Sequence, residues 1–170
     1  MTPNPRFPDK LITSPIWGRT DYVRLEAPFR FESDIVGTVT AEKGFDTDGA
    51  SIPAIVRPLI NPGGDLRFAS LPHDVLYWYR ATSCEPDARP VTRKEADQVI
   101  MEAMEACGCG WLVRRTVYDQ LRLWGGFAWD ANADKRKHEL NTGVYHALGE
   151  STEQASSKVH IKSHFHKLRR

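Results

Sequence analysis

The chain has 170 residues, of which 41% are hydrophobic and 10% aromatic. This composition predicts a single globular domain and excludes an intrinsically disordered chain. Lys and Arg together number 23 and Asp and Glu 22, which gives a net charge of +1. A chain so close to neutral has no bulk electrostatic attraction for nucleic acids or anionic membranes, and we therefore expect no specific nucleic-acid partner.

Membrane insertion and secretion are not expected either. No stretch approaches the roughly 20 consecutive apolar residues of a transmembrane helix. The first ten residues, MTPNPRFPDK, lack the order of charged and then apolar residues that a signal peptide shows. The three cysteines are an odd number and do not suggest a disulfide framework, so we expect structural thiols and residence in a cytoplasm, at least at first.

The N-terminal part of the chain indicates an extended arm followed by strands. Four prolines punctuate the first 16 residues, which predicts an extended, proline-rich arm over residues 1–18 that lies against something else. Short alternating stretches between Tyr22 and Thr40 predict two or three strands of a small antiparallel sheet. The segment Gly44–Pro53 is rich in turn residues and carboxylates and is predicted to be a loop.

Three helices are expected in the second half of the domain, after a helical turn or two over Ala54–Ile60. Apolar residues spaced by three and four predict a helix over Phe68–Arg80. Thr92 and Glu95 have the spacing of a capping box, so a second helix begins there and ends at Cys107–Gly108. A third helix is predicted over Trp111–Trp124, ended by the following glycine pair. The expected fold is therefore α+β, with one globular domain over residues 19–130.

The last part of the chain, residues 131–170, is predicted to be a polar, basic C-terminal tail. Residues 151–170 contain five Lys and Arg against the single acid Glu153, so the first 150 residues carry a net charge of −3. Such a charge run is either a solvated tail or a segment that docks on an acidic protein or on a phosphate-bearing surface.

The residues most suited to chemistry lie on the first two predicted helices. His73 and Tyr77 are four residues apart and share a helix face, while Asp97 lies at the border of the apolar stripe of the second helix. A partly buried carboxylate requires a partner such as His, Arg or a metal. If the two helices pack antiparallel, His73 and Asp97 meet, and an Asp-oriented His is the unit of general-base catalysis.

A metal site is the second candidate feature. Asp48 and Asp74, with backbone carbonyls of the Asp46–Gly49 loop, offer the hard oxygen ligands that calcium (Ca²⁺) prefers. Zinc (Zn²⁺) held by His73 and carboxylates is the alternative metal. Two further interpretations stay open: His73 is a structural residue with satisfied contacts, or Ser51, His73 and Asp97 form a hydrolase triad.

Two resemblances connect these residues to known proteins. The order Gly44-Phe45-x-x-Asp48-Gly49-Ala50-Ser51-Ile52-Pro53, His73-Asp74-x-x-Tyr77 and Arg93-x-x-Ala96-Asp97, with Met104 and Gly108 following, resembles a phage and prophage family known as domain of unknown function number 1353. The resemblance covers residues from about 20 to 125. The same residues are similar to the phospholipase A₂ pattern, in which a helix with His-Asp-x-x-Tyr faces a second helix with an Asp.

The phospholipase resemblance implies a role for each matching residue. His73 would activate water, Asp97 would orient the His73 ring, and Tyr77 belongs to the same catalytic motif. Asp74, Asp48 and the Gly49 carbonyl would bind Ca²⁺. Secreted phospholipases brace the His helix with disulfides, whereas no cysteine lies near His73 here, so the resemblance in fold implies more than the resemblance in activity.

Two hypotheses for function follow from the sequence. In the first, a phage-associated, metal-dependent hydrolase acts on host envelope lipid or peptidoglycan. In the second, the protein is a non-enzymatic virion component of the tail, baseplate or connector, which docks on other virion proteins through its arm and its basic tail. In both, the expected location is the virion, or the host cytoplasm before assembly.

Overall fold

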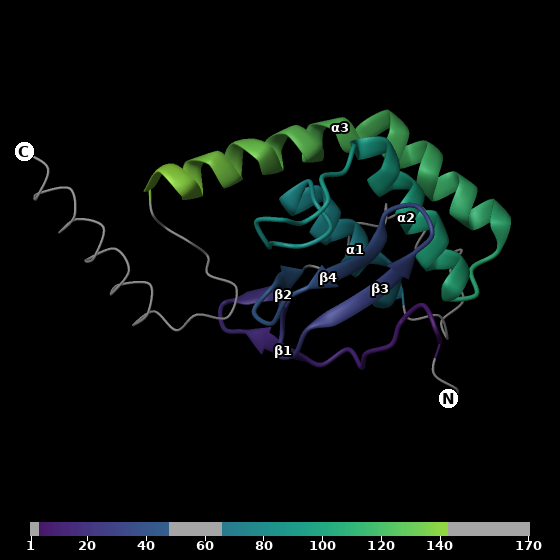
Figure 1. The fold of residues 1–170 in the computed structure, drawn as a ribbon, viewed down its shortest axis with the longest axis horizontal. Helices are drawn as coiled ribbons and strands as arrows, with labels where there is room; N and C mark the ends of the chain where they lie inside the picture. The colour runs from purple at the N-terminus through teal and green to yellow at the C-terminus, as the bar shows by residue number, and fades with distance from the viewer. Residues whose placement is uncertain (1–3, 48–65, 143–170) are drawn as a thin grey trace, which may run out of the picture.

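The structure is a computed structural model in which residues 4–47 and 66–142 are described. These residues form antiparallel strands followed by three helices, which confirms the expected α+β class. The β3–β4 hairpin packs on helices α1 and α2, and α3 lies along the other side of this helix pair (Figure 1). The strands are β1 (Thr13–Ile16), β2 (Arg19–Leu25), β3 (Phe29–Ser33), β4 (Gly37–Ala41) and β5 (Asp46–Thr47), and the helices are α1 (Leu66–Tyr79), α2 (Arg93–Ala106) and α3 (Trp111–Thr142).

The predicted strand region forms β2, β3 and β4. The β3–β4 hairpin is antiparallel, and Phe29 and Phe31 of β3 are buried while Arg30 between them is exposed, as the alternation in the sequence predicts. Ile35 and Val36 lie in the connecting turn, where both of their amides donate to the Ser33 hydroxyl. Ile35 and Val36, which the sequence pattern placed in a strand, therefore belong to the turn.

Two short strands were not expected from the sequence. β1 lies inside the arm and β5 inside the predicted loop, and both pair antiparallel with β2. β5 has only two residues, which is too short for any periodic pattern, and Asp46 accepts two hydrogen bonds from Arg24 of β2 at 2.7 and 3.0 Å. Pairing with β2 therefore makes these segments strands, although their own sequences favour turns or extended chain.

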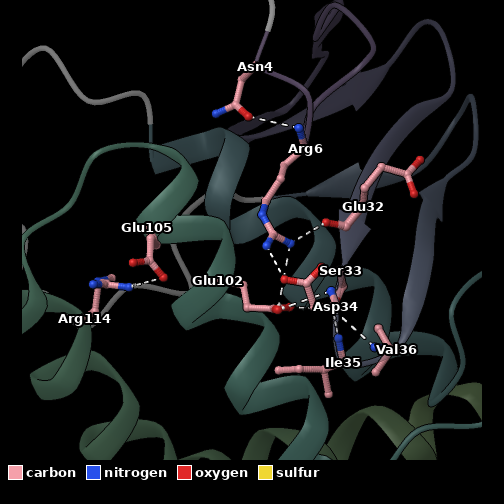
Figure 2. A network of polar contacts seen from close by, with 10 residues as sticks. All are labelled: Asn4, Arg6, Glu32, Ser33, Asp34, Ile35, Val36, Glu102, Glu105 and Arg114. Carbon is pink, nitrogen blue, oxygen red and sulfur yellow. Dashed lines mark hydrogen bonds and ion pairs between the residues drawn. The ribbon is translucent and has the colours of Figure 1, made fainter.

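The N-terminal arm lies against the domain of the same chain. Phe7 is 8% exposed, and its ring packs against those of Phe29, Phe31 and Phe68. Figure 2 shows Asn4 and Arg6 beside the end of β3 and helix α2. The side-chain Nδ2 of Asn4 donates to the carbonyl of Ala106 at 2.6 Å, at the C-terminal end of α2. The arm thus completes the apolar core and satisfies a free helix-end carbonyl.

Arg6 connects the arm to two further elements. Its guanidinium donates to the carbonyl of Glu32 at 2.9 Å, pairs with Asp34, and lies 3.9 Å from the carboxylate of Glu102 on α2 (Figure 2). Glu102 in turn accepts from the Ser33 hydroxyl at 2.5 Å. These contacts hold the end of the hairpin against α2.

Helices α1 and α2 follow the sequence prediction closely. The capping box at the start of α2 is present, because Thr92 accepts from the amide of Glu95 and the Glu95 side chain accepts from the amide of Thr92. The helix ends with Cys107 as its C-cap, followed by Gly108 at φ 79°. A bridge between Ala81 and Pro90 draws the end of α1 to the start of α2, so the two helices run back along each other.

The predicted end of the third helix is wrong. α3 continues through Gly125 and Gly126 to Thr142 without a break, past the boundary at residue 130 that was predicted for the domain. Neither glycine has a positive φ. An added Cβ at Gly125 would lie 2.5 Å from the Tyr77 hydroxyl oxygen. Gly125 is therefore a site of close helix approach, which a sequence pattern cannot distinguish from a helix stop.

The buried side chains form one apolar core between the strands and the helices. Cys84, Cys107 and Cys109 form no disulfide in the structure. In the part of the chain that the structure describes, none of the helices combines the length and the apolar character of a membrane span. The helical turns predicted over Ala54–Ile60 lie outside the described residues. The division into the three segments 1–18, 19–130 and 131–170 stays a prediction.

Candidate functional site

The candidate site lies where the three helices meet. α1 contributes His73 and Tyr77 from one face, and α2 contributes Asp97. Their side chains are almost entirely enclosed: His73 is 2% exposed, Tyr77 5% and Asp97 0%. The two polar residues that the sequence pairs across α1 and α2 do lie together, with His73 Nε2 3.7 Å from Asp97 Oδ1. This separation is an ion-pair contact and exceeds a hydrogen bond.

The carboxylate of Asp97 is held by donors from two helices. The Tyr77 hydroxyl donates to Oδ1 at 2.5 Å, and Arg122 Nη1 of α3 donates to Oδ2 at 2.7 Å. Arg93 Nη1 lies 4.0 Å from Oδ2. Burial opposes the charged form, but the contacts with His73, Tyr77 and Arg122 outweigh it and hold the pKa of Asp97 below its ordinary value. Asp97 is therefore a buried, ionised carboxylate.

His73 lies between two carboxylates. Its Nε2 faces Asp97, and its Nδ1 is 4.0 Å from Oδ1 of Asp74. Within the described residues neither ring nitrogen has a hydrogen-bond partner. Burial favours the neutral ring, but the two carboxylates outweigh burial and raise the pKa of His73. The imidazole is thus poised to hold a proton, with both nitrogens available for a closer contact.

Tyr77 supports both members of this pair. Its ring lies over the His73 ring, with the ring centres 4.1 Å apart, and makes an edge contact with Trp129 of α3. Burial, together with the neighbouring Asp97 charge, raises the pKa of the Tyr77 phenol. The hydroxyl therefore stays protonated and serves as a donor to Asp97.

The predicted metal ligands are described only in part. Asp74 is 14% exposed, and its Oδ2 accepts a hydrogen bond from the hydroxyl of Thr47 in β5 at 2.6 Å. Asp48 and Gly49 directly follow Thr47 in the sequence and lie outside the described residues, as does Ser51. Within residues 4–47 and 66–142, no three His, Cys, Asp or Glu side chains form a group that could hold a metal. The structure thus brings Asp74 to the strand that leads into the predicted calcium loop.

Sequence reasoning missed the contribution of α3. The sequence predicts an Arg, His or metal partner for Asp97. Arg122 is that partner, and it lies on α3, whose length the sequence analysis underestimated. Gly125 lies one turn further along α3, and Arg93 donates to the carbonyls of Leu121 and Arg122 at 3.1 and 3.4 Å. The rule that a buried carboxylate needs a cation predicts the kind of residue, but the register between helices selects which one.

Comparisons with known proteins give a family and nothing finer. A family model described as protein of unknown function (DUF1353) matches residues 23–120. The matched segment includes His73, Asp74, Tyr77 and Asp97 and ends two residues before Arg122. No curated protein and no solved structure matches the chain. The family model carries no statement about phage origin or phospholipase activity. Because the match covers more than half of the sequence, the chain belongs to the DUF1353 family.

Proposed function

We propose that this protein is a phage-associated hydrolase that cleaves esters in lipids of the host envelope. The observation that carries the proposal is the fully buried carboxylate of Asp97, 3.7 Å from His73 Nε2 and fixed by Tyr77 and Arg122. A carboxylate fixed beside an imidazole orients the ring and stabilises the imidazolium that forms when the ring accepts a proton. We further propose that the protein acts in the virion, or is made in the host cytoplasm before assembly.

The proposed reaction is hydrolysis with His73 as the base. A water molecule transfers a proton to Nδ1 of His73 while its oxygen attacks the ester carbonyl carbon, and the carbonyl electron pair moves to oxygen. The tetrahedral species then expels the alcohol, which takes the proton from His73, so one ester and one water give one acid and one alcohol. Asp97 holds the ring in place, and Tyr77 is a positioning residue because it acts through Asp97.

Calcium is the proposed metal. The carboxylate of Asp74 on α1 accepts from Thr47 of β5 and is a hard oxygen ligand of the kind that Ca²⁺ prefers. Asp48 and the Gly49 carbonyl would complete the set of ligands. When bound, Ca²⁺ would stabilise the negative charge that develops on the ester oxygen.

Lipid hydrolysis is tested with vesicles of phosphatidylethanolamine and phosphatidylglycerol, in which fatty-acid release is measured with calcium and with a chelator. We expect release by the full chain, a loss of about 10³-fold in His73→Ala and of 10²-fold or more in Asp97→Asn. The matched control is Asp87→Asn, a carboxylate change at an exposed position. Full activity of His73→Ala would contradict the proposal. Release of soluble fragments from purified peptidoglycan, without fatty-acid release from vesicles, would replace the lipid by a glycan or peptide substrate.

A second candidate function is a non-enzymatic virion component of the tail, baseplate or connector. The observation that favours it is the burial of His73, because a ring that is only 2% exposed and lies between two carboxylates also fits a structural cation. Mass spectrometry of purified particles from a host that carries the gene distinguishes the two. If the His73→Ala variant enters particles at the level of the unmodified protein, and neither protein hydrolyses lipid, the result supports the non-enzymatic role. Absence of the protein from particles contradicts that role.

A further inference from the structure

The outward side of α3 carries an apolar stripe. Among the described residues, five of the seven exposed large hydrophobic side chains lie on this helix. Leu123 is 70% exposed, Trp124 65% and Phe127 75%, and at about 100° per residue they lie within about 100° of arc. Leu112 lies about 20° outside this arc, beside Leu123, and is 70% exposed. We call these four residues the outer stripe of α3.

The outer stripe exposes a sizeable apolar surface. Trp124 and Phe127 together leave roughly 300 Å² of aromatic surface uncovered, at 150–250 Å² per fully buried ring. The largest apolar patch on a typical monomer measures about 300–600 Å² and is often functional. On the adjoining side of α3, about 20° and 60° from Trp124 at 100° per residue, Val117 and Leu121 are 0% and 7% exposed and belong to the core.

The charges around the outer stripe restrict what can cover it. Asp119, Asp130 and Asp134 lie within about 80° of Phe127 on the helix, and Lys135 is the one basic residue of segment 112–135 in that arc. The side chains of Asp119 and Asp130 are 49% and 81% exposed, and they pair with Arg115 at 3.0 Å and with Arg80 at 3.6 Å, respectively. The fitting occupant is an apolar segment with basic neighbours.

The same chain contains such a segment. Ile161, Phe165 and Leu168 recur at a spacing of four and three, and residues 158–170 contain five Lys and Arg around them. This segment lies outside the described residues. We propose that residues 158–170 dock on the outer stripe of α3, with the apolar side chains on Leu123, Trp124 and Phe127 and the basic side chains beside the aspartates.

The connection is long enough for this contact. From Thr142 at the end of α3, Phe127 lies 15 residues back, which is about 22 Å along the helix. The 16 residues from Thr142 to Lys158 span up to roughly 50 Å when extended. A tether of this length holds the segment at an effective concentration of about 1 mM, so a weak contact suffices to keep the segment docked.

The test uses carbodiimide cross-linking of the full chain, which joins a Lys amine to an Asp carboxylate in direct contact. Equal amounts of ¹⁴N-labelled and ¹⁵N-labelled protein are mixed, so that links within one chain differ in mass from links between chains. We expect links from Lys162 and Lys167 to Asp130 and Asp134, with under about one tenth between chains.

Three variants decide whether the outer stripe creates the contact. We expect at least a fivefold loss of these links in the triple variant Ile161→Ser, Phe165→Ser, Leu168→Ser, and the same loss in Phe127→Ser. Trp17→Ser is the matched control, because Trp17 is 101% exposed on the turn between β1 and β2, and it should leave the yield unchanged. Circular dichroism checks that every variant keeps its helix content.

Three results overturn the proposal. An unchanged yield in the triple variant shows mere proximity through the tether. Links of which half join light to heavy protein show that a second copy covers the outer stripe. The absence of any link between the Lys residues and the Asp residues shows that the segment does not reach α3.

Discussion

Replacing Gly125 by Ala tests how closely α3 approaches the candidate site. The added Cβ would lie 2.5 Å from the Tyr77 hydroxyl oxygen and 3.5 Å from Cζ, whereas ordinary contact begins near 3.4 Å. Relief requires a shift of about 0.9 Å by α3 or by the phenol. Tyr77 is enclosed and donates to Asp97, so either movement breaks buried packing or a hydrogen bond to a charged group.

The magnitude follows from three opposing effects. Overpacking costs about 2 kcal/mol, and a weakened hydrogen bond to a carboxylate costs about 2 kcal/mol. Replacing a helical Gly by Ala returns about 1 kcal/mol. The expected net loss in the free energy of unfolding is about 3 kcal/mol, which lowers Tm by roughly 6–12 °C for a domain of this size.

Gly126 provides a matched control one residue away. A Cβ at Gly126 meets only Arg93, at 3.9 Å, so Gly126→Ala should gain up to about 1 kcal/mol from helix propensity alone. Thermal and urea unfolding, followed by circular dichroism, measure both variants. In addition, Tyr77→Phe combined with Gly125→Ala should be less destabilised than the sum of the two single changes, by about 1 kcal/mol or more, since the clashing oxygen is removed. Equal stability of Gly125→Ala and Gly126→Ala would refute the close approach.

Three further predictions concern stability. Arg122→Met leaves the buried carboxylate of Asp97 with one cation fewer and should cost roughly 2 kcal/mol at pH 7, reduced from the value for a fully buried pair because Arg122 is 33% exposed. The pKa of Asp97 is lowered by folding, so its stabilisation is present above its ordinary pKa and lost as pH falls; urea titrations should show the penalty shrinking at acid pH, and a constant penalty would contradict the ion pair. Thr92→Ala should cost about 1 kcal/mol in the same assay at pH 7. Hydrogen bonds from Thr92 and Arg89 lower the pKa of Glu95 to about 2 in the folded chain. The stabilisation from Glu95 should therefore disappear as pH falls from 4.5 toward 2, and a stability that stays constant over this range would contradict the capping box. Phe7→Ala should cost about 3–5 kcal/mol if the arm belongs to the core, and a thermal melt identical to that of the unmodified chain would show that it does not.

Local patterns in the sequence determine much of the helical part of the fold. The boundaries of α2 follow from Thr92, Glu95 and Gly108, because capping residues act on amides and carbonyls within one turn. The contact between His73 and Asp97 also follows, since helix periodicity gives the face of each residue and the short connection makes the helices run back along each other.

Tertiary structure decides what depends on distant partners. β5 is a strand because β2 lies beside it, and the arm is ordered because Phe7 enters the core. Gly125 lies inside α3, where the missing Cβ leaves room for the Tyr77 hydroxyl, although the sequence favours a helix end there. The choice of Arg122 as the cation for Asp97 depends on the register of α3 against α2. Sequence thus determines local geometry and the need for a partner, while packing between elements selects the partner, because its energy comes from residues far apart in the chain.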